Sequence, residues 1–532
     1  MKSRYISASH FIFKIVFVSF LTYILLGCSP RSDEIQITPL IPEEQAFDYG
    51  VAENIEEVEC EFGNRDNDDD GPDVNAECGY LTVPEDRNEP DGKKIRLPYT
   101  ILKGTGPETL SDPLVILFSN PSPVLDFAFQ FRYFFGAMLA NRDIIILEQR
   151  GVGGSEPNLD CPDVERIYEA DQAESPGSEA ITQEILDGFQ ACRQKLLNDG
   201  VNLDVYTTAE SAADLEDLRQ ALGIKQWNLF GVGYGTNLAL ELMDRYPGSV
   251  RSAILESPIL LESFSLENQA VYSQASLDAF FKRCAEDSQC NAAFPNLEDI
   301  FYQQVDQLNA SPVTLEVTDI VEGSRYNYEM DGDRLLEYAL STLDNGYEGT
   351  LSELPRAIYN LSLGKTTYLA NLLGNDYGFG PDGQILSGIQ LNIYCRASTA
   401  KSSKSSQDTT AIRPQVWEFL SKDDAEFHRL CEVWNVEPDK ESQQEYRSSV
   451  PALILAGEFS YSTPVQIARQ LAGFLPRSTL VEFPGAGVFP TGSQTWADCA
   501  RQLEKQLLEQ PGSDLDTSCA DEEKNLLWIT IP

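Results

Sequence analysis

Histidine is nearly absent from this chain of 532 residues, which contains only His10 and His428. His10 falls in an apolar leader, and His428 follows Phe427 in a stretch with helical patterning, where a surface or packing role is the simplest interpretation. Imidazole is the side chain that most often transfers protons in enzymes near neutral pH. The sequence therefore offers little for histidine-based catalysis.

Basic residues are also scarce, with 39 Lys and Arg against 84 Asp and Glu and a formal charge of −45. Such an acidic chain is repelled by phosphate groups, which argues against nucleic acid or an anionic membrane surface as a partner. We interpret the excess as a solvated acidic surface. Apolar residues make up 42% of the chain, which is enough for a substantial core.

Long apolar runs are limited to Phe11–Leu26, which is interrupted only by Lys14 and is preceded by basic residues. The run ends in Leu-Leu-Gly-Cys28, which resembles a bacterial lipobox. We predict that residues 1–27 are a signal peptide and that Cys28 is lipidated, so that the protein lies outside the cytoplasm, anchored to a bacterial membrane by lipid only. An ordinary signal peptide or a transmembrane anchor is the alternative.

The segment 28–59 is polar and acidic, and we predict a tether. Redox or zinc motifs of the C-x-x-C type are missing from the chain. Apart from Cys28, ten of the eleven cysteines remain, an even number that suits an oxidising compartment. Sequence alone does not fix their connectivity, and nearest-neighbour pairing is the simplest hypothesis: Cys60 with Cys78, Cys161 with Cys192, Cys284 with Cys290, Cys395 with Cys431, and Cys499 with Cys519.

An acidic loop lies between the first two of these cysteines. Asp66, Asp68, Asp70 and Glu77 follow the D-x-D-x-D-G-x5-E spacing of a calcium loop, with Gly71 at the sharp turn. Asp follows the turn where an apolar residue is usual, and flanking helices are not evident. The alternatives are a structural Ca²⁺ site and a solvated acidic loop; no other cofactor is expected.

Strands and helices alternate from Tyr80 onward, which predicts a mostly parallel sheet with helices on its faces. We expect eight strands: Tyr80–Val83, Ile95–Leu102, Leu114–Phe118, Asp143–Leu147, Trp227–Phe230, Ala253–Leu255, Ala452–Leu455 and Thr479–Phe483. Helical patterning between strands six and seven predicts a large, mainly helical cap over residues 261–449. The α/β core is then expected over 60–260 and 450–532, closed by a helix at Trp496–Leu508.

A glycine-rich turn joins the fifth strand to a helix at Gly231-Val232-Gly233-Tyr234-Gly235. Its outer glycines match the G-x-S-x-G nucleophile elbow of α/β-hydrolases, in which strand and helix cross at close range. The nucleophile is usually Ser, but Gly233 stands in its place. The turn therefore predicts an eight-stranded α/β-hydrolase fold and lacks the atom that would attack a substrate.

Further motifs make the chain similar to the tripeptidyl aminopeptidase-like relatives of proline iminopeptidase. They are found at Cys78–Asp86, Glu148–Ser155, Tyr206–Leu215, Gly457–Pro464, Pro484–Gly487 and Asp516–Cys519, in addition to the elbow. Members of this family are exported serine peptidases that release short peptides or proline from free N-termini. The resemblance covers nearly all of the mature chain.

The resemblance also locates the positions of the catalytic triad. The family's Asp lies in a turn that here reads Gly457-Glu-Phe-Ser460-Tyr-Ser-Thr-Pro, and its His lies in a turn that here reads Pro484-Gly-Ala-Gly-Val488. Ser460 and Val488 thus replace the acid and the base, as Gly233 replaces the nucleophile. Ser257, Ser460 and Ser462 remain as hydroxyls near these positions, but a Ser hydroxyl without a base is a weak nucleophile.

Other parts of the family's site have also changed. The oxyanion-hole positions correspond to Asn120 and Tyr234, and the usual glycine-rich loop reads Ser-Asn-Pro-Ser-Pro. The family's acidic residue after the cap cysteine, which holds the substrate's amine, is missing, because Cys395 is followed by Arg396.

Three functions are consistent with these observations. The first is a pseudoenzyme, kept as a protein that binds a partner, a peptide or a small molecule under the cap. The second is a serine-type hydrolase or aminopeptidase with relocated catalytic groups, acting on peptides or esters. The third is a calcium-stabilised structural lipoprotein. The changes at Gly233, Ser460 and Val488 favour the pseudoenzyme.

Overall fold

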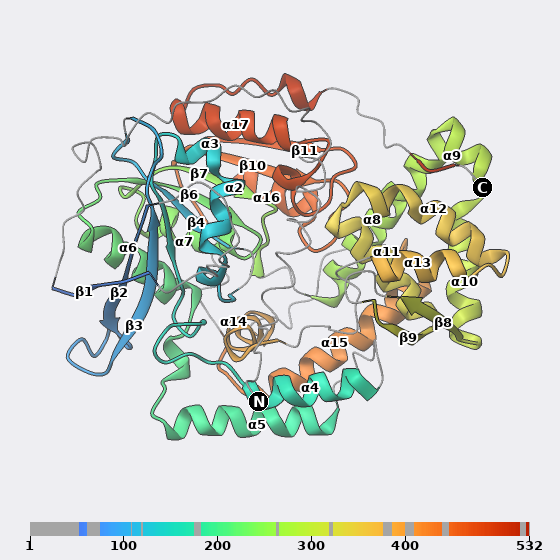
Figure 1. Ribbon diagram of the computed structural model, residues 1–532, viewed down its shortest axis with the longest axis horizontal. Helices are drawn as coiled ribbons and strands as arrows, with labels where there is room; N and C mark the ends of the chain where they lie inside the picture. Colours follow the sequence, from blue (N-terminus) through green and yellow to red (C-terminus); the bar gives the residue numbers. More distant parts are fainter. Residues whose placement is uncertain are drawn as a thin grey trace, which may run out of the picture. The chain divides into compact units, whose positions relative to one another are not determined.

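The computed structural model describes residues 53–60, 75–107, 109–118, 121–174, 182–261, 265–318, 323–375, 386–399, 409–438, 446–521 and 528–530. Its main sheet has nine strands in the order β1-β2-β3-β5-β4-β6-β7-β10-β11 (Figure 1). The strands are β1 (Ile55–Val58), β2 (Ala76–Pro84), β3 (Lys94–Leu102), β4 (Leu114–Leu117), β5 (Ile144–Leu147), β6 (Trp227–Val232), β7 (Val250–Glu256), β10 (Ala452–Gly457) and β11 (Ser478–Phe483).

All eight predicted strands are present, and the α/β-hydrolase strand order is confirmed. The expected number of strands was one too low, because β1, which lies within the segment predicted to be a tether, pairs antiparallel with β2 at the edge of the sheet. Every residue of β4, β5 and β10 is buried, as expected for strands covered on both faces.

The chain forms two compact units. The first comprises the described residues within 1–116, 122–158 and 213–229. In it β2, β3 and β5 pair antiparallel, with Tyr99 opposite Leu147, and β4 runs parallel to β5. This unit contains a buried ion pair, in which Nε and Nη2 of Arg150 donate to the Asp214 carboxylate, both at 2.8 Å. Its short helices are η1 (Leu125–Gln130), α2 (Phe131–Phe134) and α3 (Gly136–Leu139), and most of α6 (Thr208–Ala221) also belongs to it.

The second unit comprises the described residues within 117–121, 159–212 and 230–532. Here β7, β10 and β11 run parallel, with Ala253 opposite Ala452 and Ala452 opposite Ser478. α7 (Gly235–Arg245) contacts β7, α16 (Val465–Phe474) contacts β10 and β11, and α17 (Ala497–Glu509) contacts β7 and β10 (Figure 1). The unit also contains α4 (Pro162–Glu174), α5 (Gln183–Asn198) and the turns η2 (Leu203–Val205), η5 (Pro490–Gly492) and η6 (Ser518–Ala520).

Because β7 and β10 are neighbours, residues 258–451 form an insertion between adjacent strands, which we call the inserted segment. Its helices are α8 (Leu266–Glu286), α9 (Ser288–Ala293), α10 (Leu297–Ala310), α11 (Gly332–Asn345), α12 (Glu348–Ser362), α13 (Thr367–Asn375), α14 (Gly388–Thr399) and α15 (Pro414–Trp434). The sequence did not predict the hairpin of β8 (Val313–Thr318) and β9 (Arg325–Met330) that it also contains.

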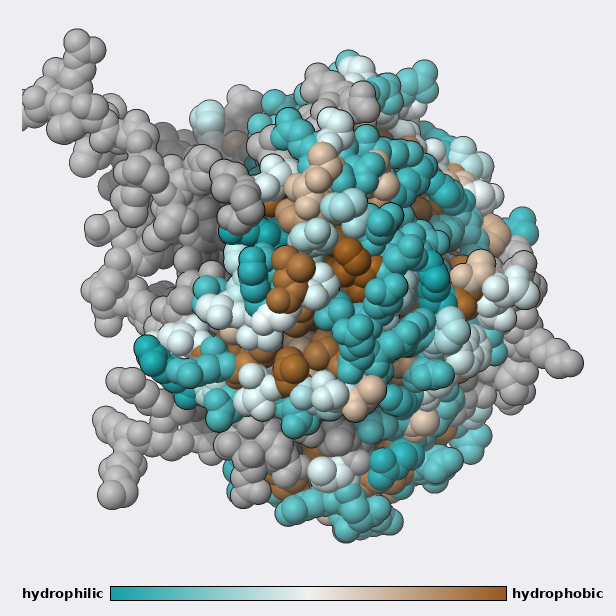
Figure 2. Space-filling model, turned by 90° about the vertical axis from the view of Figure 1, so that its right-hand side faces the viewer, coloured by the Kyte–Doolittle hydropathy of each residue, from teal (hydrophilic) through white to brown (hydrophobic). Residues whose placement is uncertain are grey.

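Helices α8 to α13, the hairpin and the start of α15 pack apolar side chains into one hydrophobic core, which Phe459 joins from outside the inserted segment. Figure 2 shows the face of the molecule on the α9 and α12 side, which is mostly hydrophilic with a small apolar area near its middle. α11 has clear ends: Asp331 caps its first turn by accepting from the Arg334 amide, and Gly346 ends it with φ 61°.

All five predicted disulfides are confirmed, with Cα–Cα distances of 5.1 to 5.7 Å. Each joins two successive cysteines of the chain, 6 to 36 residues apart, so each closes a local loop. Cys28 lies outside the described residues, as do 1–52 in general. Among the described helices, none has the length and apolarity needed to cross a membrane.

Candidate functional site

The elbow has the geometry that its glycines predict. Gly233 has φ 53°, in the left-handed region, between the end of β6 and the start of α7. A Cβ atom on Gly231 would lie 2.7 Å from the Gly235 carbonyl oxygen, and one on Gly235 would lie 1.9 Å from the Leu117 carbonyl oxygen. The outer glycines are therefore required by close backbone contact, and the central position has no side chain.

The residue after the elbow is tied into the core. Tyr234 is fully buried, its hydroxyl lies 3.0 Å from Thr208 Oγ1, and its ring packs edge-on against Tyr394. Burial raises the pKa of the Tyr234 phenol well above its usual range, so the hydroxyl stays neutral. Asn120, the other predicted oxyanion-hole position, lies outside the described residues.

The turn that follows β10, residues 458–464, contains Ser460, and we call it the acid turn. The Ser460 hydroxyl is buried and donates to Asp344 Oδ1 at 2.6 Å, while it also accepts from the Thr463 amide at 3.1 Å. Ser462 donates its hydroxyl to Asp344 Oδ2 at 2.8 Å. A carboxylate therefore does reach the acid turn, but it comes from α11 of the inserted segment.

The turn that follows β11, residues 484–488, contains Val488, and we call it the second turn. The Val488 amide donates to the carbonyl oxygen of Asp344 at 2.5 Å, and its carbonyl oxygen accepts from the Ser257 hydroxyl. Ser257 itself has φ 51°, which is rare for Ser and fits the tight end of β7. Ser460 and Val488, predicted to share a site, are thus brought together through Asp344.

Asp344 was not singled out from the sequence. It lies in the last turn of α11, where a negative charge is unfavourable to the helix dipole. That placement could have indicated a tertiary partner. Desolvation raises the pKa of Asp344, and hydrogen bonds from Ser460 and Ser462 oppose the rise.

His428 lies on α15 and is half exposed, with Nε2 3.4 Å from Asp424 Oδ2 one turn earlier on the same helix. This agrees with the surface role expected from the sequence. His10 lies outside the described residues. The acid turn, the second turn and the elbow contain no imidazole.

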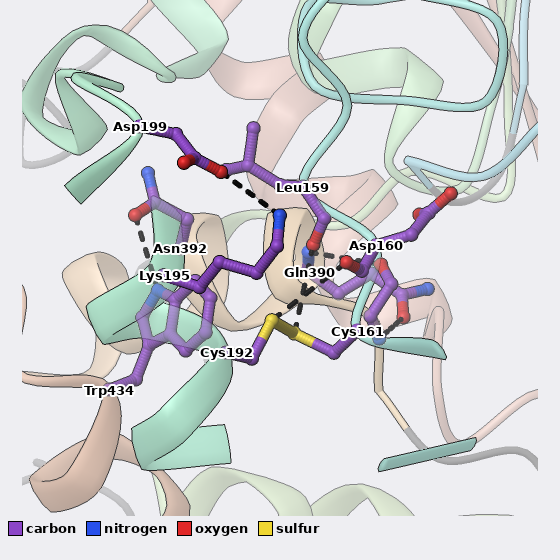
Figure 3. The surroundings of a disulfide bond; sticks show 10 residues. Leu159, Asp160, Cys161, Cys192, Lys195, Asp199, Gln390, Asn392 and Trp434 are labelled. Carbon is purple, nitrogen blue, oxygen red and sulfur yellow. Dashed lines mark hydrogen bonds and ion pairs between the residues drawn. A yellow bond between two sulfur atoms is a disulfide. The ribbon is translucent and has the colours of Figure 1, made fainter. Parts of the chain in front are cut away.

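Arg396 follows Cys395, where the family has an acidic residue that holds the substrate's amine. Its guanidinium donates to Asp204 at 2.8 Å and to the Leu203 carbonyl oxygen at 3.1 Å, so it holds the turn at η2. Asn392, one turn earlier on α14, donates to the same turn and accepts from the Trp434 indole at 3.2 Å. Figure 3 shows this contact beside the Cys161–Cys192 disulfide, which joins the residue before α4 to α5.

Two further buried carboxyl groups, Glu256 and Glu504, were not singled out from the sequence. Glu256 at the end of β7 accepts from the Thr491 amide, and Glu504 on α17 accepts from the Thr491 hydroxyl, both at 2.7 Å. Neither is exposed, and the second carboxyl oxygen of each has no hydrogen-bond partner among the residues that the structure describes. Burial and mutual repulsion raise the pKa of Glu256 to about 8, and burial raises that of Glu504 to about 7.

The proposed calcium ligands Asp66, Asp68 and Asp70 lie outside the described residues, so that site stays a prediction. Glu77 is described; it belongs to β2 and its carboxylate lies 3.5 Å from Lys103 Nζ. Within the part of the chain that the structure describes, no three His, Cys, Asp or Glu side chains are grouped to hold a metal ion.

Two family models match the chain. The one described as the alpha/beta hydrolase fold covers residues 127–301, and the one described as TAP-like protein covers residues 418–519. The first match contains the elbow, and the second contains the acid turn and the second turn.

Named relatives match part of the chain. Tripeptidyl aminopeptidase of Streptomyces lividans is 32% identical over 217 residues, which cover 38% of this chain and 38% of that enzyme. Serine protease Hip1 of Mycobacterium tuberculosis is 27% identical over 231 residues, which cover 41% of this chain and 43% of that protein. The chain thus aligns with less than half the length of these relatives.

Among solved structures, a proline iminopeptidase-related protein from Thermus thermophilus is 14% identical, with a TM-score of 0.33. The alignment covers 82% of this chain and 98% of the other. A TM-score of 0.33 supports no inference about this chain. The strand order and the family models carry the assignment of the fold.

Proposed function

Because the chain belongs to the α/β-hydrolases related to tripeptidyl aminopeptidase, we propose that it is a non-catalytic member of that family that binds a ligand or partner. The observation that supports this proposal is the set of groups at the three triad positions. Gly233 offers no nucleophile, Val488 offers no base, and the Ser460 hydroxyl is bonded to Asp344.

Acyl transfer in this fold needs a nucleophile that loses its proton to an imidazole as it attacks. Two serine hydroxyls near these turns donate to groups other than an imidazole: Ser462 donates to the Asp344 carboxylate, and Ser257 donates to the Val488 carbonyl oxygen. Without a positioned imidazole, these contacts favour a structural role for both hydroxyls. The engaged Arg396 also argues against a site for a substrate's ammonium group.

Fluorophosphonate labelling and peptide turnover test the proposal. We expect the purified protein to show neither labelling nor release of a chromogenic group from N-terminally free tripeptides above a protein-free blank. Labelling of the wild type that disappears in Ser460→Ala or Ser462→Ala would overturn the proposal and favour a serine hydrolase with relocated groups.

A rebuilt triad provides the matched positive control. It combines Gly233→Ser, Ser460→Asp and Val488→His with Asp344→Asn, because Asp344 lies within hydrogen-bond distance of position 460. Labelling gained by this variant alone would place the lost activity at the triad positions.

We further propose that the protein is exported and anchored by lipid at Cys28. Five disulfides support an oxidising compartment, since such bonds rarely persist in the cytosol. Expressed in bacteria with radiolabelled palmitate, the wild type is expected to incorporate label and sediment with membranes. Cys28→Ser should abolish both, and label retained by Cys28→Ser would refute the anchor at that residue.

A further inference from the structure

The acid turn is embedded in the inserted segment by an apolar anchor. Phe459 is fully buried and belongs to the hydrophobic core formed by the helices of that segment. Its ring packs edge-on against Phe280 of α8, and its carbonyl oxygen accepts from the Ser276 hydroxyl at 2.5 Å. Burial of the Phe459 ring therefore packs the acid turn against α8.

Charged contacts connect the same helix to both turns. Arg283 of α8 donates to Glu458 Oε2 at 2.7 Å, and the Gly485 amide donates to the same oxygen at 2.7 Å. Glu458 therefore links α8, the acid turn and the second turn. Farther along, Glu348 of α12 accepts from the Thr495 amide at 2.7 Å.

Asp344 connects α11 directly to both turns through hydrogen bonds. Its carboxylate accepts from the Ser460 hydroxyl and from the hydroxyl and amide of Ser462, while its backbone carbonyl accepts from the Val488 amide. One residue thus bonds to both turns, with its side chain on one and its main chain on the other.

Two glycines allow the main chains to meet. A Cβ atom on Gly346 would lie 2.5 Å from the Gly487 nitrogen, and one on Gly487 would lie 2.2 Å from the Asp344 carbonyl oxygen. The chain at 344–346 and the second turn are therefore in direct backbone contact, which a side chain at either glycine would prevent.

We propose that Asp344 is a latch that keeps the inserted segment closed on the acid turn and the second turn. A carboxylate at position 460 would meet the carboxylate of Asp344 at hydrogen-bond distance, and like charges so close repel strongly. Ser460 removes that conflict and supplies a donor instead. A ligand or partner that takes the place of Asp344 at the buried Ser460 hydroxyl must displace the latch, whether or not the protein has catalytic activity.

A charge-swap experiment tests the latch. Hydrogen exchange is followed by mass spectrometry in residues 332–346, 458–464 and 484–488 for the wild type, Ser460→Asp, Asp344→Asn and the double variant. We expect Ser460→Asp to speed exchange in all three stretches by about tenfold or more, because several bonds are lost together. Adding Asp344→Asn should return the rates toward those of the wild type.

Ser513→Asp is the matched control, since it adds the same charge at an exposed position outside these turns. Rates in Ser460→Asp that equal those of Ser513→Asp would overturn the latch, as would a double variant that exchanges as fast as Ser460→Asp. If Ser460→Asp does not fold, recovery of folded protein on adding Asp344→Asn supports the proposal, and failure of the double variant to fold refutes it.

Discussion

At the scale of single residues, Gly487 in the second turn has no room for a side chain. The atoms that a Cβ would meet there are backbone atoms of Asp344 and Gly346, which move less easily than the end of a side chain. We expect Gly487→Ala to lower the free energy of unfolding by about 1–3 kcal/mol through overpacking. Thermal unfolding followed by circular dichroism measures the change.

Gly473 provides the control for that substitution. It lies exposed in α16, and a Cβ atom there would meet nothing within 4 Å. Gly473→Ala should raise stability by about 0.5–1 kcal/mol, because Ala loses less backbone entropy in a helix. Equal effects of the two substitutions would contradict the proposed backbone contact.

Single residues also show which contacts can be predicted from the sequence. Gly231 and Gly235 could be predicted as elbow glycines because their spacing reflects a local turn. The contact between Asp344 and Ser460 joins residues that are far apart in the chain, and no local pattern encodes it. The pairing of Glu256 with Glu504 was missed for the same reason, since each looks like an ordinary surface acid in the sequence.

At the scale of elements, the strands of the core were predictable because buried parallel strands are unbroken apolar runs. The hairpin β8–β9 was not predicted. β8 alternates apolar and polar residues as a half-buried strand does, but its partner, Arg325–Met330, has few apolar residues. The disulfide pairs were predictable because each closes a local loop, the arrangement in which sequence neighbours are the nearest partners.

Because the disulfides close loops of different length, we expect them to contribute differently to the free energy of unfolding. Cys395–Cys431 closes a separation of 36 residues and Cys284–Cys290 one of 6, while all four cysteines are buried. In the chain-entropy model, replacing both cysteines by Ala should cost about 4 kcal/mol for the first pair and about 2 kcal/mol for the second. Urea unfolding of the two double variants measures the difference, and an equal or reversed order would show that loop entropy does not dominate.

At the scale of the whole molecule, the formal charge of −45 makes the dependence of stability on pH informative. Exposed carboxyl groups are almost fully ionised by about pH 6, so their mutual repulsion changes little above that value. Burial raises the pKa of Asp160 to about 6, which adds a contribution mainly below pH 6.5. A change in stability between pH 6.5 and 8.5 therefore reports chiefly on groups that titrate near 7 and 8.

Glu256 and Glu504 are such groups, with pKa values raised to about 8 and about 7 in the folded chain. Because a raised pKa favours the protonated folded state, their stabilisation is complete below the unfolded pKa and is lost as pH rises through 7 and 8. We expect the Tm to fall between pH 6.5 and 8.5. Glu504→Gln keeps an oxygen for the Thr491 hydroxyl and should flatten this fall. Glu509→Gln, half exposed on the same helix, should leave it unchanged; equal slopes in both variants would exclude the buried pair as its cause.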